Sequence, residues 1–171
     1  MVVLIGITAV VLVLGSGFYI RQRNIDDAKT YIVRVNGEGI TRLEYVKELA
    51  ITKHFFVWAK QDVGKLPSLE KDVLDRMVEM KIISQYANKN KIVVSQKEIE
   101  DRFKVSLGKK SESEFLTTIN EMYGMDKNDY LQNLSNDLLK EKVQGKLGEP
   151  LAVWLVKMKK TVSIKYSAVV D

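Results

Sequence analysis

The sequence predicts a mainly helical domain, closed by a small two-stranded sheet of its N- and C-terminal strands and preceded by one transmembrane helix. An uncharged apolar stretch opens the chain, and apolar residues recur at helical spacing through most of the remaining residues. Alternating segments typical of strands stand only near residue 31 and near residue 164. Because a lone strand leaves its backbone groups unpaired, we expect these two segments to pair with each other.

The composition is that of a folded protein. The chain has 171 residues, of which 46% are hydrophobic and 29% are charged, and this suits one domain with an appendage. It has no cysteine, which excludes disulfides, thiolate metal sites and cysteine nucleophiles. The formal charge of +5 is spread among interspersed acidic and basic residues, without an arginine-rich run. We therefore predict no nucleic-acid partner.

The apolar stretch "VVLIGITAVVLVLGSGFYI" covers residues 2–20 without a charge. A helix of this length crosses a bilayer core of roughly 30 Å. We interpret residues 1–20 as an uncleaved transmembrane anchor, the alternative being a cleaved signal peptide, and residues 21–30 as a juxtamembrane connector. Arg21 and Arg23 follow the span, and the positive-inside rule alone would put residues 31–171 in the cytoplasm.

The domain begins with a strand at "YIVRVN", where Tyr31 and Val33 alternate with polar and apolar neighbours. The "NGEG" that follows favours a tight turn. Thr41 and Glu44 then form a capping box, which predicts a helix to about Gln61. We therefore expect no second strand before the C-terminal one.

Five more helices are predicted from start and stop signals. Ser68 and Asp126 are candidate N-caps, and "SQKE" and "SESE" are further capping boxes. Gly124 is a candidate C-terminal stop, and Pro150 suits the start of the last helix. The expected ranges are 69–90, 96–107, 112–124, 127–147 and 151–160. A second strand follows at "TVSIKYS", which would bring the last helix beside the first.

The sequence predicts no catalytic, cofactor-binding or metal-binding residues. His54 is the sole histidine, and without cysteine it has no partner for a shared metal. Glu98, Glu100 and Asp101 are the densest acidic group, which we interpret as first-turn charge at a helix N-terminus. Phosphate-binding and hydrolase motifs do not occur.

Apolar and aromatic side chains are the candidates for binding. Methionine-rich apolar surfaces re-pack around varied partners, although methionine at helical spacing is more often core. The candidate peptide-binding residues are Phe55, Phe56, Trp58, Met122, Tyr123 and Met125.

Two segments resemble the SurA/PrsA/PpiD group of extracytoplasmic chaperones over residues 31–147. The first is "VNGEGITRLEY", with Val35, Asn36, Gly37, Ile40, Thr41, Glu44 and Tyr45 on the group's pattern. The second matches at Leu74, Met77, Val78, Ile82, Ala87, Ile92, Val94, Ser95, Glu98 and Ile99. The resemblance implies a helical chaperone module that cradles unfolded polypeptide, and it admits a swapped homodimer.

Many members of that group carry a parvulin prolyl-isomerase domain before the closing segment. Here only "GKLGEP" stands at that place, so isomerase activity is not carried over. The resemblance also implies a single-pass membrane protein with its domain on the extracytoplasmic side, against the arginine rule. We therefore predict a cofactor-free, membrane-anchored chaperone-like module that binds non-native polypeptide. The alternatives are a bitopic adaptor that docks one partner, and a degenerate isomerase.

Overall fold

A computed structural model describes residues 30–167 of the chain. The predicted transmembrane segment of residues 2–20 and most of the predicted connector lie outside the described residues. Between residues 30 and 167, no helix is both long enough and apolar enough to cross a bilayer.

The sheet has three strands, so the prediction of a two-stranded sheet was wrong in this respect. β1 (Tyr31–Val35), β2 (Glu38–Thr41) and β3 (Ile164–Tyr166) are antiparallel neighbours in the order β2-β1-β3. Asn36 and Gly37 both adopt positive φ, at 51° and 89°. This is the backbone of a two-residue hairpin turn, which folds the segment after it back onto β1 instead of leading straight into a helix.

The predicted closure of the domain by its two ends is confirmed. Val35 of β1 faces Ile164 of β3, and Val33 faces Tyr166. The ladder continues past the strand end, where the Ser167 amide donates to the Ile32 carbonyl at 2.8 Å. The N- and C-terminal strands therefore share one sheet, in which β1 pairs with β2 on one edge and with β3 on the other.

The helices follow the predicted ranges closely. They are α2 (Arg42–Trp58), the short 3-10 helix η1 (Val63–Lys65), α3 (Leu69–Lys89), α4 (Gln96–Leu107), α5 (Glu112–Tyr123), α6 (Lys127–Gln144) and α7 (Leu151–Thr161). All three capping boxes, at Thr41, Ser95 and Ser111, make both of their hydrogen bonds. Ser68 makes no such cap, because its hydroxyl donates to the Asp72 carboxylate at 2.9 Å.

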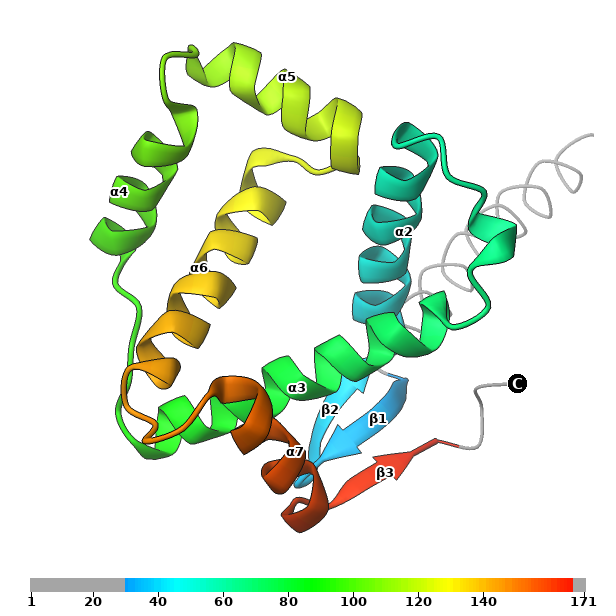
Figure 1. Ribbon diagram of the computed structural model, residues 1–171, viewed down its shortest axis with the longest axis vertical. Coiled ribbons are helices and arrows are strands. Elements are labelled where there is room, and N and C mark those ends of the chain that lie inside the picture. The colour runs from blue at the N-terminus through cyan, green and yellow to red at the C-terminus, as the bar shows by residue number, and fades with distance from the viewer. Residues whose placement is uncertain (1–29, 168–171) are drawn as a thin grey trace, which may run out of the picture.

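The helices form a frame above the sheet (Figure 1). α3 lies along its base, α2 and α6 rise from α3, and α5 crosses from the end of α4 to α2. α4 packs against the other side of α6. The last helix, α7, packs mainly against α3 and α6, so the expectation that it would lie beside the first helix was wrong.

The core lies where the sheet meets α3, α6 and α7. Its buried members are Ile32, Val33, Val35, Ile40, Val78, Ile82, Ile83, Ala87, Val143, Trp154 and Leu155. A separate aromatic cluster joins α4, α5 and α6, where the rings of Phe103, Phe115 and Tyr130 meet edge to face at 5.2–6.1 Å. The part of the frame distant from the sheet therefore has its own apolar support.

Candidate functional site

A groove of about 730 Å³ lies between α2, α3 and α6. Its apolar lining comes from β2, α2 and α3, and consists of Ile40, Ile51, Val73, Met77 and Met80. Met77 and Met80 also pack against the main core from the groove side. The floor of the groove is therefore an adaptable apolar surface held by the rigid part of the fold.

The wall formed by α6 is entirely polar. Its lining side chains recur at three- and four-residue spacing, which puts them on one helix face: Asp129, Gln132, Asn133, Asn136, Asp137 and Lys140. Leu134 and Leu138 are buried on the other side of the helix. α6 thus presents charged and amide groups to the groove while its apolar stripe holds it against its neighbours.

The charges in the groove balance. Four basic side chains line it, namely Lys47, Arg76, Lys81 and Lys140. Four acidic side chains line it as well, namely Glu44, Glu48, Asp129 and Asp137. Since the whole chain carries +5, the groove is more nearly neutral than the rest of the protein. Such a surface does not select strongly for an anion or a cation.

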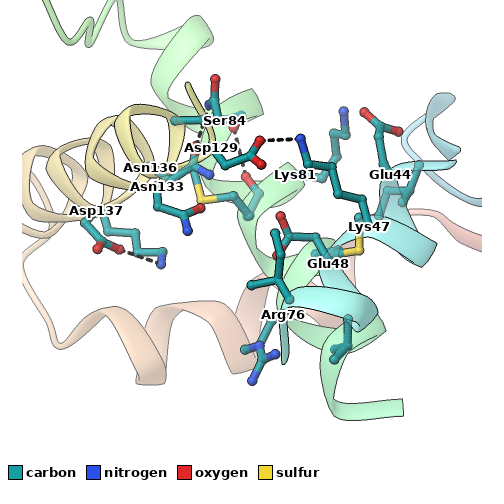
Figure 2. Close-up of a pocket in the computed structure, with 17 residues that line it drawn as sticks. Glu44, Lys47, Glu48, Arg76, Lys81, Ser84, Asp129, Asn133, Asn136 and Asp137 are labelled. Carbon is teal, nitrogen blue, oxygen red and sulfur yellow. Dashed lines mark hydrogen bonds and ion pairs between the residues drawn. The ribbon is translucent and has the colours of Figure 1, made fainter. Parts of the chain in front are cut away.

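One ion pair crosses the groove from wall to wall. The ammonium of Lys47 on α2 pairs with the carboxylate of Asp129 on α6, as Figure 2 shows. Hydrogen bonding to Asp129 raises the pKa of Lys47. The pair joins two helices that otherwise approach each other through α3 and α5.

Glu48 lies one residue further along α2, inside the groove. Burial raises the pKa of its carboxyl group, and the nearby charges of Arg76 and Lys47 oppose that shift. The Arg76 guanidinium also donates to the Thr52 hydroxyl at 3.1 Å. The α2 wall therefore holds a carboxyl group that is harder to ionise than an exposed one.

Three of the residues predicted for peptide binding meet at the junction of α2 and α5. The Phe55 ring stacks on Tyr123 with centroids 5.1 Å apart, and on Trp58 at 6.0 Å. Beside them, His54 Nε2 forms a hydrogen bond of 3.0 Å with the backbone carbonyl of Glu121. His54 thus ties the two helices together through this bond.

The other three candidates lie in the same region. Phe56 and Met122 are half-buried, and Met125 is buried, with its sulfur accepting a hydrogen bond from Asn133 at 3.4 Å. None of the six predicted residues lines the groove. Their role in binding stays a prediction.

Sequence reasoning missed the groove itself. The one signal in the sequence is the polar face of α6. Because most polar helix faces are exposed to solvent, this signal does not by itself predict a groove. Within residues 30–167, no group of three His, Cys, Asp or Glu side chains is placed to hold a metal ion. Glu98, from the densest acidic group, caps α4 with Ser95 and forms an ion pair with Lys142.

Comparison with known proteins gives one match. A family model described as the SurA-like N-terminal domain matches residues 1–144, and no parvulin domain is matched. The match covers the groove helices α2, α3 and α6, and it begins before the described residues. Comparison with curated proteins and with solved structures returned no match.

Proposed function

The chain belongs to the SurA-like N-terminal domain family, and on this premise we propose that it is a membrane-anchored, extracytoplasmic chaperone-like module without isomerase activity. The family is a chaperone-type domain and is not a catalytic one. In this proposal, residues 2–20 anchor the chain in the membrane and the groove holds segments of non-native polypeptide.

The groove is the observation that carries the proposal. Its floor offers the flexible side chains of Met77 and Met80, which adapt to apolar groups of different shape. Its walls offer both signs of charge and several amides, so few polypeptide sequences are repelled. Apolar burial contributes about 25 cal/mol per Å², and ordering a flexible ligand opposes it. The expected binding is weak, reversible and unselective, as a holding function requires.

Suppression of aggregation tests this function. The full chain, held in lipid nanodiscs because of its apolar residues 2–20, is mixed with a chemically unfolded client, and light scattering is followed. We expect suppression near stoichiometric ratios, and we expect the groove variant Met77→Ser/Met80→Ser to lose most of it. The matched control Val105→Ser/Val156→Ser removes two exposed apolar side chains outside the groove and should retain it. Absence of suppression by the wild-type chain would reject the proposal.

The compartment is tested separately. The proposal places the domain on the extracytoplasmic side, so protease added to intact spheroplasts should digest it. Protection until lysis would instead support the orientation that Arg21 and Arg23 favour.

A second candidate function, an adaptor that docks one fixed partner, is favoured by the outer face of α2. No residue of α2 is buried, and Leu43, Val46 and Val57 are 60%, 52% and 65% exposed. Apolar side chains so exposed on one helix are typical of an interaction surface. Affinity capture from membranes separates the two functions, because an adaptor retains one stoichiometric partner and loses it in the Leu43→Ser/Val46→Ser variant.

A further inference from the structure

We propose that the outer face of the sheet binds the phosphate of an anionic phospholipid headgroup. This face is turned away from α3 and carries Tyr31, Arg34, Gly39 and Lys165. Arg34 and Lys165 would bind the phosphate, and the Tyr31 ring would lie among the headgroups beside them. The inference rests on the proposed function in one point only, the anchoring of residues 2–20 in the membrane.

A β-bulge brings Tyr31 to this outer face. The register of β1 against β2 shifts between Tyr31 and Val33, and Ile32 and Val33 are both buried. Strict alternation would place Tyr31 and Arg34, which are three residues apart, on opposite faces of the sheet. A bulge adds a residue to one strand and re-aims the side chain beside it. Tyr31 and Arg34 therefore share the outer face.

Three residues stack on this face. A Cβ atom at Gly39 would overlap the Tyr31 ring, so the ring covers the place where any other residue would carry its side chain. The Arg34 guanidinium lies over the same ring, 4.0 Å from its centroid, and donates to the Gly37 carbonyl at 3.1 Å. These two contacts restrict the guanidinium to one orientation and leave most of its N–H donors available for a ligand.

Lys165 lies directly across the ladder from Arg34. Opposed residues of antiparallel strands have Cα atoms about 5 Å apart, so the two cations can reach one phosphate group. Like charges placed directly opposite each other destabilise a sheet. None of the ion pairs among residues 30–167 includes either side chain. A bound anion would therefore neutralise a repulsion that this part of the chain leaves in place.

The pocket at this place has no acidic lining. Its volume is about 330 Å³, and it is lined by Tyr31, Val33, Arg34, Lys165, Tyr166 and Ser167. The groove between α2, α3 and α6 contains, by contrast, as many acidic as basic side chains. The outer face is thus complementary to an anion, and guanidinium and ammonium groups are common phosphate ligands in proteins.

The length of chain before Tyr31 favours the membrane as the source of this phosphate. Ten residues separate Tyr31 from Ile20, where the apolar stretch ends, and ten residues span at most about 36 Å. When residues 2–20 are anchored, the sheet is therefore held close to the bilayer surface, where headgroups have a high local concentration. Tyrosine is also enriched at this interface, because its ring is apolar and its tip is polar.

Quenching by labelled headgroups tests the site. The full chain carries bimane on Ser163→Cys, because Ser163 is exposed and stands two residues before Lys165, on the same side of the chain. The labelled chain is placed, one copy per disc, in nanodiscs of phosphatidylcholine or of phosphatidylcholine mixed with anionic phosphatidylglycerol. Both kinds of disc contain the same small fraction of phosphatidylcholine that bears a nitroxide quencher on its headgroup.

We expect stronger quenching in the discs that contain phosphatidylglycerol. The variant Arg34→Gln/Lys165→Gln should lower the quenching there to the value seen with phosphatidylcholine alone. Removing one of the two cations should lower the ratio of docked to undocked domains about five-fold, and removing both should lower it about twenty-five-fold.

The matched control is Lys109→Gln/Lys110→Gln. It removes the same charge from two exposed residues between α4 and α5, which meet at the part of the frame distant from the sheet (Figure 1). This variant should be quenched like the wild-type chain.

Urea unfolding of Lys165→Gln separates binding from folding, because this change leaves the stack of Arg34 on Tyr31 intact. Its midpoint should equal or exceed that of the wild-type chain, since the opposition of like charges is relieved. A lower midpoint would mean that Lys165 supports the fold, and it would overturn the assignment of this cation to a ligand.

The outcomes separate this inference from the proposed function. Equal quenching in the two kinds of disc, or quenching that Arg34→Gln/Lys165→Gln leaves unchanged, overturns the headgroup site and leaves the proposed function standing. Quenching that follows the number of chains per disc, and not the content of phosphatidylglycerol, assigns the face to a second copy and also overturns the site. If the full chain does not enter nanodiscs, the proposed anchoring fails and this inference fails with it.

Discussion

Lys47 on α2 and Asp129 on α6, 82 residues apart in the sequence, form an ion pair across the groove. α2 and α6 are the opposite walls, and both rest on α3. An ion pair between partly exposed side chains contributes little to the free energy of unfolding, with a median of about 0–1 kcal/mol. The ion pair therefore mainly limits the distance between the two walls of the groove and adds little to the stability of the fold.

Lys47→Met should widen the distribution of distances between α2 and α6 while changing the unfolding free energy by less than about 1 kcal/mol. Because the chain has no cysteine, spin labels on Ala50→Cys and Asn128→Cys can report this distance by pulsed electron paramagnetic resonance. Lys71→Met is the matched control, since it removes an exposed pair within α3. An unchanged distribution would show that α3 and α5 alone hold the walls.

Asn36 should be the most sensitive residue of the hairpin. Its φ is 51°, its side chain donates to Gln85 at 2.9 Å, and it accepts from the Ser163 amide at 3.0 Å. Asn36→Ala strains the turn and removes both bonds, and we expect a loss of about 2 kcal/mol in urea unfolding. Asn36→Gly tolerates the positive φ, so it should lose less. Equal losses in the two variants would contradict the contribution of backbone strain.

Phe103→Ala should loosen the part of the frame distant from the sheet. Phe103 is buried against Phe115 and Tyr130 and is not part of the main core. Truncating a buried phenylalanine costs about 3–5 kcal/mol. In hydrogen exchange, amides of α4 and α5 should therefore exchange faster, while those of β1 and α3 stay protected. Val105→Ala, an exposed change in the same helix, serves as control.

The cap of α4 should weaken in acid. The Glu98 carboxylate accepts hydrogen bonds from Lys142 and from the backbone and side chain of Ser95. These bonds, the one from Lys142 most of all, lower the pKa of Glu98 from its ordinary 4.5 to about 2. A lowered folded-state pKa means that the contribution of Glu98 to stability is complete above pH 4.5 and is lost as the pH falls toward 2.

Carbon-13 titration of the Glu98 carboxyl measures this pKa directly. Lys142→Gln should shift its midpoint upward, and Glu98→Gln should remove part of the loss of stability between pH 4.5 and 2. A wild-type midpoint near 4.5 would mean that the pair with Lys142 does not persist in solution.

The predicted binding role of the aromatic residues can be tested through tryptophan fluorescence. Trp58 is 49% exposed and Trp154 is 8% exposed, and they are the two tryptophans of the chain. In a Trp154→Phe background, we expect emission from Trp58 to shift to shorter wavelength when an unfolded client binds. Binding without a shift would confine the site to the groove, which these residues do not line.

The helix boundaries were predictable because their signals are local. In each capping box, Thr41, Ser95 and Ser111 bind a glutamate three residues ahead, so both partners stand within four letters of sequence. The pairing of the end strands was predicted from the need to satisfy the backbone of a lone strand. The pairing is present, but β1 is not alone, because β2 occupies its other edge.

The hairpin and the groove were missed for two different reasons. Thr41 is both the last residue of β2 and the N-cap of α2. Its capping box indicates the helix, and it leaves only three residues between the Asn36-Gly37 turn and the cap for a strand. The groove depends on tertiary approach, because its α2 and α6 walls come from distant parts of the sequence. In the sequence, the polar faces of α2 and α6 look like solvated helix surfaces. They form a groove only because both helices pack on α3 and face each other.

The antiparallel pairing of β1 with β3 has a mechanical consequence. Residue 30 and residue 167 lie at the same end of the ladder, where Ser167 bonds to Ile32. A force that pulls these two points apart loads the hydrogen bonds one after another, since the bonds run across the strands. Loaded in this way, β3 would separate from β1 bond by bond at low tension and expose the end of α7.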